Sequence, residues 1–308
     1  MGLIDENTSG VFVISVTPFD EQGAIDWRSL DRVTDFYFEA GADGLTILGM
    51  MGEAPKLTQA EALEISRRVI ARAGNRPVVV GVSAPGLAAL RELSMAAMDI
   101  GAAGVMVAPP GSLQTDTQIH AYYGQVVNVL GPDVPVVLQD FPLATKVAIS
   151  DEVLARIIND FPSIKMLKHE DWPGLQKITK IRQAEAAGQR RISILCGNGG
   201  GFLAEEMARG ADGAMTGFGY PEMMVQIARL MTAGEKDRAH DLFDAYLPLI
   251  RYESQPGLGL AVRKHVLAQR GAIASPALRA PGSGLTAAAA AEVDYLISRQ
   301  ERRLKELG

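Results

Sequence analysis

The stretch I-K-M-L-K-H-E-D-W-P-G, residues 164–174, is an apolar run that ends in a group of ionisable residues. Its composition predicts a buried strand that ends at a functional surface, and in a barrel of parallel strands the catalytic side chains lie at the carboxyl ends of the strands. Lys168 is the leading candidate, because an apolar environment disfavours the charged amine and a neutral amine attacks carbonyl groups. The alternative is a lysine that forms an ion pair with Glu170 or Asp171. This stretch alone does not decide between the two.

Apolar segments of the same kind recur along the chain and alternate with segments of helical spacing. The predicted strands are Val11–Phe19, Gly44–Gly49, Pro77–Ser83, Gly104–Pro110, Pro135–Pro142, Ile164–Glu170, Ile192–Gly197 and Gly213–Gly219. Strands that are apolar on both faces are typical of a parallel sheet that is covered by helices.

A weak internal repeat supports eight strand–helix units. Gly41–Gly44, Gly101–Gly104 and Gly210–Gly213 each contain a glycine that suits the end of a helix and a second glycine that opens a strand. Their separation corresponds to about 30 residues per unit, and eight such units close a barrel. An open doubly wound sheet is the rival architecture, but it would rarely need eight evenly spaced strands. The sequence therefore predicts an α/β fold, a (βα)8 TIM barrel.

The chain continues well beyond the eighth predicted strand. Further helices are predicted at Met223–Ala233, Lys236–Gln255, Leu258–Arg270 and Thr286–Leu307. Because only the first of them is needed to complete eight units, we divide the chain into a barrel, residues 1–233, and an appended C-terminal α-helical segment, residues 234–308. The apolar faces of Ala239–Ile250 and Val293–Ile297 exceed what a barrel needs to cover itself, which predicts self-association.

The composition argues against several classes of protein. The 308 residues carry a formal net charge of −6, whereas nucleic-acid binders need a basic face. No run of 18 apolar residues predicts a membrane span, and Met1–Gly10 lacks the apolar core of a signal peptide. The single cysteine, Cys196, lies in a mostly apolar run, which predicts a core residue and fits a reducing cytoplasm.

Three short motifs carry a resemblance to a known family. They are L-G-M-M-G-E at 48–53, V-L-Q-D-F-P at 137–142 and M-L-K at 166–168, on the second, fifth and sixth predicted strands. Together they resemble the dihydrodipicolinate synthase / N-acetylneuraminate lyase family of Schiff-base aldolases and dehydratases, over nearly the whole chain. The resemblance implies that Lys168 forms an imine with a small 2-oxo acid such as pyruvate, without a cofactor. It also implies a homo-oligomer, a dimer or a tetramer.

The departures from the family pattern matter as much. The strand-five tyrosine of the family, which relays protons, is Gln139 here, and the following asparagine is Asp140. The two loop threonines are Met50 and Met51. The Gln-Asp pair resembles the L-2-keto-3-deoxyarabonate dehydratase branch of the family, although the second-strand loop differs from it.

Gln139 has no ionisable group, so it can orient a substrate or a water but cannot act as a general acid or base. The alternative is a polar plug of the barrel mouth. Another group must then move the protons, and the sequence does not choose among the candidates. They are Glu53, His169, Glu170, a water and the carboxylate of the substrate. For Glu53, a structural role in bonding loop amides is the simpler interpretation beside a catalytic one.

The remaining candidates are expected to bind the substrate. Gly49, Met50, Met51 and Gly52 form a loop whose amides suit a carboxylate, with the methionines making the pocket more apolar or more adaptable. Asp140 takes the position that the family asparagine has in the resemblance. Asn198 lies in the glycine-rich loop at 197–201, which is a candidate anion site or simply a tight turn, and Thr216 and Gly217 end the eighth predicted strand. A metal is not predicted, because the consecutive residues of His169–Asp171 point to opposite faces of a strand.

Two classes of function fit this pattern. The first is a lyase that acts on a 2-oxo acid, such as a 3-deoxy-2-oxo sugar acid. Loss of the tyrosine favours dehydration over pyruvate-releasing or pyruvate-condensing aldol chemistry. The second is a non-catalytic barrel that binds 2-oxo acids and has a regulatory role.

Overall fold

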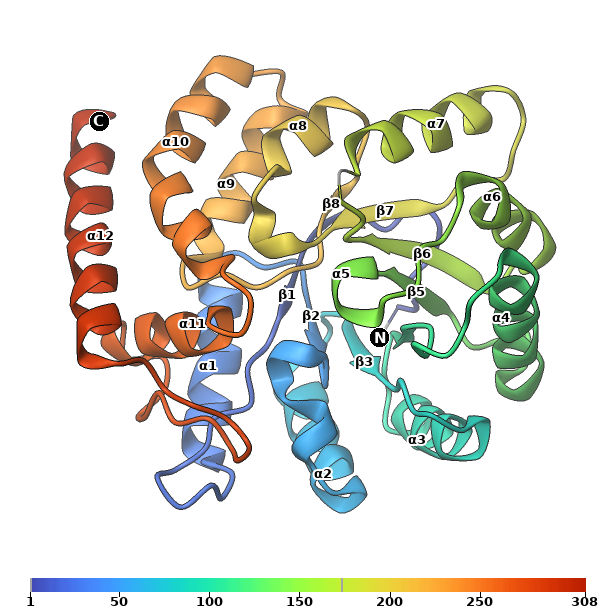
Figure 1. Cartoon of the computed structure of the whole chain (residues 1–308), viewed down its shortest axis with the longest axis horizontal. Coiled ribbons are helices and arrows are strands. Elements are labelled where there is room, and N and C mark those ends of the chain that lie inside the picture. Colours follow the sequence, from blue (N-terminus) through green and yellow to red (C-terminus); the bar gives the residue numbers. More distant parts are fainter. Residues whose placement is uncertain (1, 173) are drawn as a thin grey trace.

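The strands of the computed structural model, which describes residues 2–172 and 174–308, close into a parallel barrel in the order β1 to β8 (Figure 1). They are β1 (Gly10–Ile14), β2 (Gly44–Ile47), β3 (Val78–Gly81), β4 (Gly104–Val107), β5 (Val136–Asp140), β6 (Ile164–His169), β7 (Ser193–Cys196) and β8 (Gly213–Ala214). β1 pairs with β2 on one side and with β8 on the other. The sheet therefore has no open edge, which excludes the doubly wound alternative.

Helices follow the strands and surround the barrel (Figure 1). They are α1 (Trp27–Glu39), α2 (Gln59–Ala73), α3 (Leu87–Asp99), α4 (Asp116–Leu130), α5 (Pro142–Thr145), α6 (Asp151–Asp160), α7 (Leu175–Ala186), α8 (Leu203–Ala208), α9 (Pro221–Thr232), α10 (Lys236–Glu253), α11 (Gly259–Gln269) and α12 (Ala287–Glu306). Short 3-10 turns lie at η1 (Met50–Gly52), η2 (Ala54–Lys56) and η3 (Asn198–Gly200). The predicted TIM barrel is confirmed.

The glycine repeat acts at the helix-to-strand junctions. Gly41, Gly101 and Gly210 end their helices with φ of +94°, +97° and +100°, a region in which a residue with a side chain is strained. β2, β4 and β8 each begin at the last glycine of the repeat. The repeat was thus a valid signal for the period of the barrel.

β1 and β8 end well before the predicted strand ends. Single backbone hydrogen bonds continue the ladder past these ends, such as Ser15 N–H to the Thr46 carbonyl at 2.9 Å, and the chain then turns into loops that bond to neighbouring loops at the mouth of the barrel. Thr17 Oγ1 donates to the carbonyl of Gly52 at 2.6 Å, and Thr216 Oγ1 accepts from the amide of Gly199 at 2.9 Å. These loops carry several of the predicted site residues.

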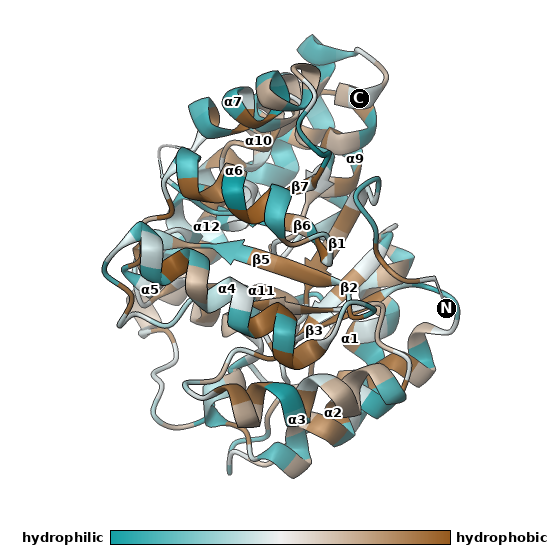
Figure 2. Ribbon diagram, turned by 90° about the vertical axis from the view of Figure 1, so that its right-hand side faces the viewer, coloured by the Kyte–Doolittle hydropathy of each residue, from teal (hydrophilic) through white to brown (hydrophobic). Residues whose placement is uncertain are grey.

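Two apolar layers hold the barrel. The outer layer joins the strands to the helices, and the inner one fills the barrel. The inner residues are Ile4, Phe12, Ile14, Val79, Ala103, Met106, Val137, Met166, Leu195 and Met215, all buried. Burial of each large side chain contributes about 1.5–3 kcal/mol. In Figure 2, β5 is brown along its length and teal at its arrowhead, where the strand leaves this apolar interior and ends in Gln139 and Asp140.

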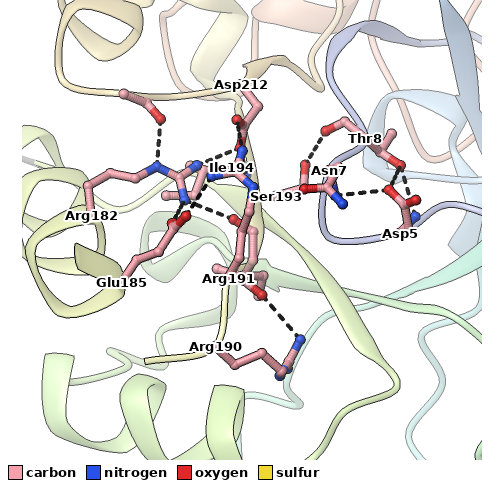
Figure 3. A network of polar contacts seen from close by, with 12 residues as sticks. Asp5, Asn7, Thr8, Arg182, Glu185, Arg190, Arg191, Ser193, Ile194 and Asp212 are labelled. Atoms are coloured by element: carbon pink, nitrogen blue, oxygen red, sulfur yellow. Dashed lines mark hydrogen bonds and ion pairs between the residues drawn. The ribbon is translucent and has the colours of Figure 1, made fainter. Parts of the chain in front are cut away.

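A network of charged residues ties the amino ends of β7 and β8 together (Figure 3). Asp212 accepts from Arg182 and Arg191, both at 2.5 Å, and from the amide of Ile194 at 2.8 Å. Glu185 pairs with both arginines. This face is opposite the one that carries Lys168, and in TIM barrels residues on it serve stability rather than catalysis.

The C-terminal helices pack on the barrel and on each other. The predicted boundary between residues 233 and 234 falls between α9 and α10. α12 stands outside α10 at the left of Figure 1, and the two helices are in contact. Phe243 on α10 and Val293 on α12 are buried within this chain, whereas Leu247 on α10 and Tyr295 on α12 are 37% and 59% exposed. The two helices thus cover part of their apolar surface within the chain and leave part of it exposed, and the predicted self-association stays a prediction.

None of the helices in the described residues is long and apolar enough to cross a bilayer.

Candidate active site

Lys168 and Gln139 lie side by side at the carboxyl ends of β6 and β5 and point into the barrel. They are direct partners in the register of the two strands. Each follows by two residues a side chain of the inner apolar cluster, Met166 for the lysine and Val137 for the glutamine, so strand alternation places both on the inner side. The exposed fraction is 5% for Lys168 and 3% for Gln139.

Glu170 completes a three-residue cluster with them. Its Oε2 lies 3.0 Å from Lys168 Nζ and accepts a hydrogen bond of 2.7 Å from Gln139 Nε2. The ion pair that was the alternative interpretation of Lys168 is therefore present. At these distances the Glu170 carboxylate can exchange a proton with the Lys168 amine.

The loop after β7 makes room for Glu170 and holds its backbone. A Cβ at Gly197 would lie 2.1 Å from Glu170 Cγ, so a side chain larger than hydrogen at 197 would displace the carboxylate. The side-chain amide of Asn198 donates to the Glu170 carbonyl at 3.2 Å. Asn198, a predicted substrate contact, thus fixes the end of β6.

Asp140 lies on the other face of β5, outside the barrel, which corrects its prediction as a substrate-binding residue. Its Oδ2 accepts from Lys177 Nζ on α7 at 2.8 Å, and Lys177 also pairs with Asp171 at 2.7 Å. Burial raises the pKa of Asp140 to about 6, although the charge of Lys177 opposes this effect. The cause of the error is strand alternation, since Gln139 and Asp140 are consecutive and only one of them faces the interior.

His169 also faces outward. Its Nε2 lies 3.0 Å from the Gly174 carbonyl, a contact that requires the Nε2–H tautomer. Burial, and then the charge of Lys177, lower the pKa of His169 to about 4, so the ring is neutral at physiological pH. His169 and Glu170 thus point to opposite faces, as the sequence predicted.

Glu53 is locked in ion pairs, and the structure does not support its predicted catalytic role. One carboxylate oxygen accepts from Lys264 at 2.6 Å. The other accepts from Lys56 at 2.7 Å and from the amide of Arg279 at 3.1 Å. Glu53 thus ties the loop after β2 to α11 and to the segment that precedes α12, which is the structural role considered for it.

The predicted carboxylate-binding loop lies over the inner apolar cluster. A Cβ at Gly49 would be 3.4 Å from Ile14 Cγ2, and Met51 packs against the cluster. Met50 is 43% exposed. The amide of Gly52 is used within the turn and donates to Gly49.

The last two predicted residues lie at the end of β8. Thr216 is buried and connects this end to the loop after β7. A Cβ at Gly217 would lie 2.4 Å from Nη1 of Arg263, a buried residue of α11. Gly217 therefore leaves space for a guanidinium group.

Trp172, half-exposed, packs edge-to-face on Phe202 with ring centroids 4.8 Å apart. The predicted Trp-Pro-Gly turn includes Pro173, which lies outside the described residues. Cys196 is buried and free, and burial holds the pKa of its thiol well above the usual value. Within residues 2–172 and 174–308, no three His, Cys, Asp or Glu side chains are grouped to hold a metal ion.

Lys177 is the residue that the sequence reasoning missed. It lies on α7, far along the chain from Asp140, and no motif marks it. Glu170 had a usable signal, because it follows Lys168 by two residues and alternation places both on one face.

A closed parallel barrel with a buried lysine, an amide and a carboxylate at the carboxyl ends of adjacent strands is the arrangement of a TIM-barrel enzyme. The chain matches the Dihydrodipicolinate synthetase family over residues 7–300, and it belongs to this family. It is a lyase of that family.

Relatives of two kinds are similar to it. L-2-keto-3-deoxyarabonate dehydratase of Azospirillum brasilense is 32% identical over 278 residues, which cover 88% of each chain. The 4-hydroxy-tetrahydrodipicolinate synthase of Pseudomonas savastanoi pv. phaseolicola is 27% identical and matches 78% of this chain and 81% of its own. Among solved structures, a dihydrodipicolinate synthase from Rhodopseudomonas palustris is 55% identical with a TM-score of 0.96, covering 97% of this chain and 100% of that chain. The predicted family is confirmed.

Proposed function

We propose that the protein dehydrates a 3-deoxy-2-oxo sugar acid through an imine on Lys168. The observation that carries the proposal is the position of the Glu170 carboxylate, in contact with both Lys168 Nζ and Gln139 Nε2. A nucleophile and a proton acceptor at hydrogen-bond distance are what amine catalysis requires. The dehydratase relative, which is similar over most of both chains, supports the same choice.

Imine formation needs two proton transfers to the substrate oxygen. Glu170 takes a proton from the Lys168 ammonium, the neutral amine adds to C2 of the 2-oxo acid, and one of the two protons left on the nitrogen moves to the C2 oxygen to give a hydroxyl group. Glu170 then returns its proton to this hydroxyl group, which leaves as water. The product is a protonated imine beside an unprotonated Glu170, so charge and atoms balance.

Dehydration uses the same carboxylate again. The protonated imine acidifies C3, Glu170 removes a C3 proton, and an enamine forms. The enamine expels the C4 hydroxyl, which takes that proton from Glu170 and leaves as water. Hydrolysis of the conjugated imine frees Lys168, and the net change is the loss of one water. Gln139 orients Glu170 and the substrate in this scheme and does not transfer a proton.

The loop after β2 is proposed to hold the carboxylate of the substrate. Its Met50 and Met51 amides are the candidate donors, and two amide donors suit the two oxygens of a carboxylate. Gly49 and Gly52 give the turn its close approach to the barrel interior. Asn198, Thr216 and Gly217 stay candidates for shaping the far side of the pocket.

The test is turnover on a panel of 3-deoxy-2-oxo acids that differ in length and in C4 configuration. Mass spectrometry of the products distinguishes loss of one water from release of pyruvate. We expect loss of water, abolished in Lys168→Arg because a guanidinium stays protonated, and reduced at least a hundredfold in Glu170→Gln. Release of pyruvate would make the protein an aldolase. An imine on Lys168 with no turnover on any member of the panel would make it a binding protein.

We also propose a cytoplasmic homo-oligomer. The single cysteine, buried and free, supports the location, and the family resemblance supports the assembly. Sedimentation at micromolar concentration that gives a monomer of 32.9 kDa would contradict the assembly.

A further inference from the structure

Lys177 holds the two strands of the proposed active site from outside the barrel. It lies near the start of α7, on the outer layer of helices (Figure 1), and is only 7% exposed. Its Nζ donates to Asp140 Oδ2 at 2.8 Å and to the carbonyl of Ile149 at 2.7 Å, and it forms an ion pair with Asp171 Oδ2 at 2.7 Å. These three contacts hold the buried ammonium group between the two carboxylates.

The two carboxylates lie directly next to the residues that face the interior. Asp140 follows Gln139 at the end of β5, and Asp171 follows Glu170 just after β6. Consecutive residues of an extended chain point to opposite faces, so a bond that fixes one of them on the outer face fixes its neighbour on the inner face. The two strand ends are also bonded directly, since the Glu170 amide donates to the Asp140 carbonyl at 2.9 Å.

We infer that Lys177 is a positioning residue, which sets the contact of Glu170 with Lys168 and Gln139 through Asp140 and Asp171. The inference rests on the proposed imine chemistry, because it assigns Lys177 a part in that reaction without contact with the substrate. A displacement of one strand end by about 1 Å increases the distance over which a proton moves between Glu170 and Lys168, and this slows imine formation.

A buried ion pair also affects stability, so the test must separate the two roles. Lys177→Met leaves the Asp140 carboxylate buried and unpaired, which lowers Tm. The double variant Lys177→Met/Asp140→Asn removes that charge as well, so Tm recovers toward the wild type. Lys180→Met is the matched control, because Lys180 lies on the same helix, pairs with Asp151 and has a side chain that is 54% exposed.

The measurement is the rate at which pyruvate forms an imine that borohydride traps, taken over a range of pyruvate concentrations on the full chain. We expect Lys180→Met to keep the Tm of the wild type and a maximal rate within about twofold of it. We expect Lys177→Met to lose at least tenfold in maximal rate. The double variant should keep that loss although its Tm has recovered, with the half-saturating pyruvate concentration changed less than the rate.

The outcomes are distinct. If the double variant regains both Tm and maximal rate, Lys177 serves stability alone and the inference is overturned. An unchanged rate in folded Lys177→Met overturns it too, and if that variant does not fold, the double variant decides. If wild-type protein traps no pyruvate at Lys168, the proposed function fails, and the inference fails with it.

Discussion

Replacement of Glu206 by glutamine should stabilise the protein at alkaline pH and change it little at acid pH. Glu206 lies on α8 and is 6% exposed, and its Oε2 has no hydrogen-bond partner in the described residues. Burial raises the pKa of Glu206 from 4.5 to about 8, although a hydrogen bond with the Cys196 side chain opposes the shift. The folded protein therefore holds this carboxyl group neutral at pH 7.

The sign and size of the effect follow from linkage. The pKa is raised on folding, so the neutral form contributes stability below about pH 4.5, and this contribution is lost as the pH rises through about 8. At 1.36 kcal/mol per pKa unit, the loss between pH 5 and pH 8 is about 3 kcal/mol. A glutamine side chain does not titrate, so Glu206→Gln should gain about 3 kcal/mol over the wild type at pH 8 relative to pH 5.

Urea unfolding at pH 5 and pH 8, at one protein concentration, measures this difference from the midpoint and the slope. Glu64→Gln is the control, because Glu64 lies on α2 and its side chain is 53% exposed. We expect the control to follow the wild type at both pH values. If Glu206→Gln and the wild type lose stability in parallel between pH 5 and pH 8, the buried neutral carboxyl group is not there and the reasoning is wrong.

Three further predictions follow from the same structure. Glu53→Gln should lower the free energy of unfolding, measured in urea, by about 3–5 kcal/mol, because it leaves the buried Lys264 ammonium without its ion pair. The double variant Glu53→Gln/Lys264→Met should recover much of this loss, and a single variant as stable as the wild type would contradict the stabilising role of the ion pair. Between pH 6.5 and pH 4 the free energy of unfolding should fall by about 3 kcal/mol more in the wild type than in His169→Gln, because the unfolded state takes up a proton that the buried ring, with its pKa of about 4, does not. Acid unfolding curves of the same shape for the two proteins would refute this. Gln139→Leu should still trap pyruvate at Lys168 but should turn over the dehydration substrate at least tenfold more slowly, because Glu170 loses its 2.7 Å hydrogen bond; undiminished turnover would remove Gln139 from the site.

The barrel was predictable because its signals are local. Gly41, Gly101 and Gly210 marked helix ends by a conformation that glycine adopts, and apolar strands between them gave the period. The end of β6 was predictable for the same reason, since two-residue alternation places Lys168 and Glu170 on one face. The ends of β1 and β8 were less predictable, because Thr17 and Thr216 bond to loops that follow other strands, and the sequence does not show which loops lie side by side.

The ion pairs were not predictable, because their partners are far apart in sequence. Asp140 and Lys177 are separated by 37 residues, and Glu53 and Lys264 by 211. Asp140 was assigned to the site because it takes the place of the family asparagine, and Glu53 because it ends the loop motif that resembles the family. The structure pairs both carboxylates with lysines on surrounding helices, Lys177 on α7 and Lys264 on α11.

The central claim is that Lys168 forms an imine, and borohydride trapping with pyruvate followed by peptide mass mapping tests it most directly. Lys165 is the internal control, because it lies three residues earlier on β6, faces outward and pairs with Glu6 at 3.0 Å. We expect the mass of one reduced pyruvyl group on Lys168, none on Lys165, and no label in Lys168→Arg. Label on Lys165, or undiminished labelling and turnover in Lys168→Arg, would contradict the account and leave only the barrel.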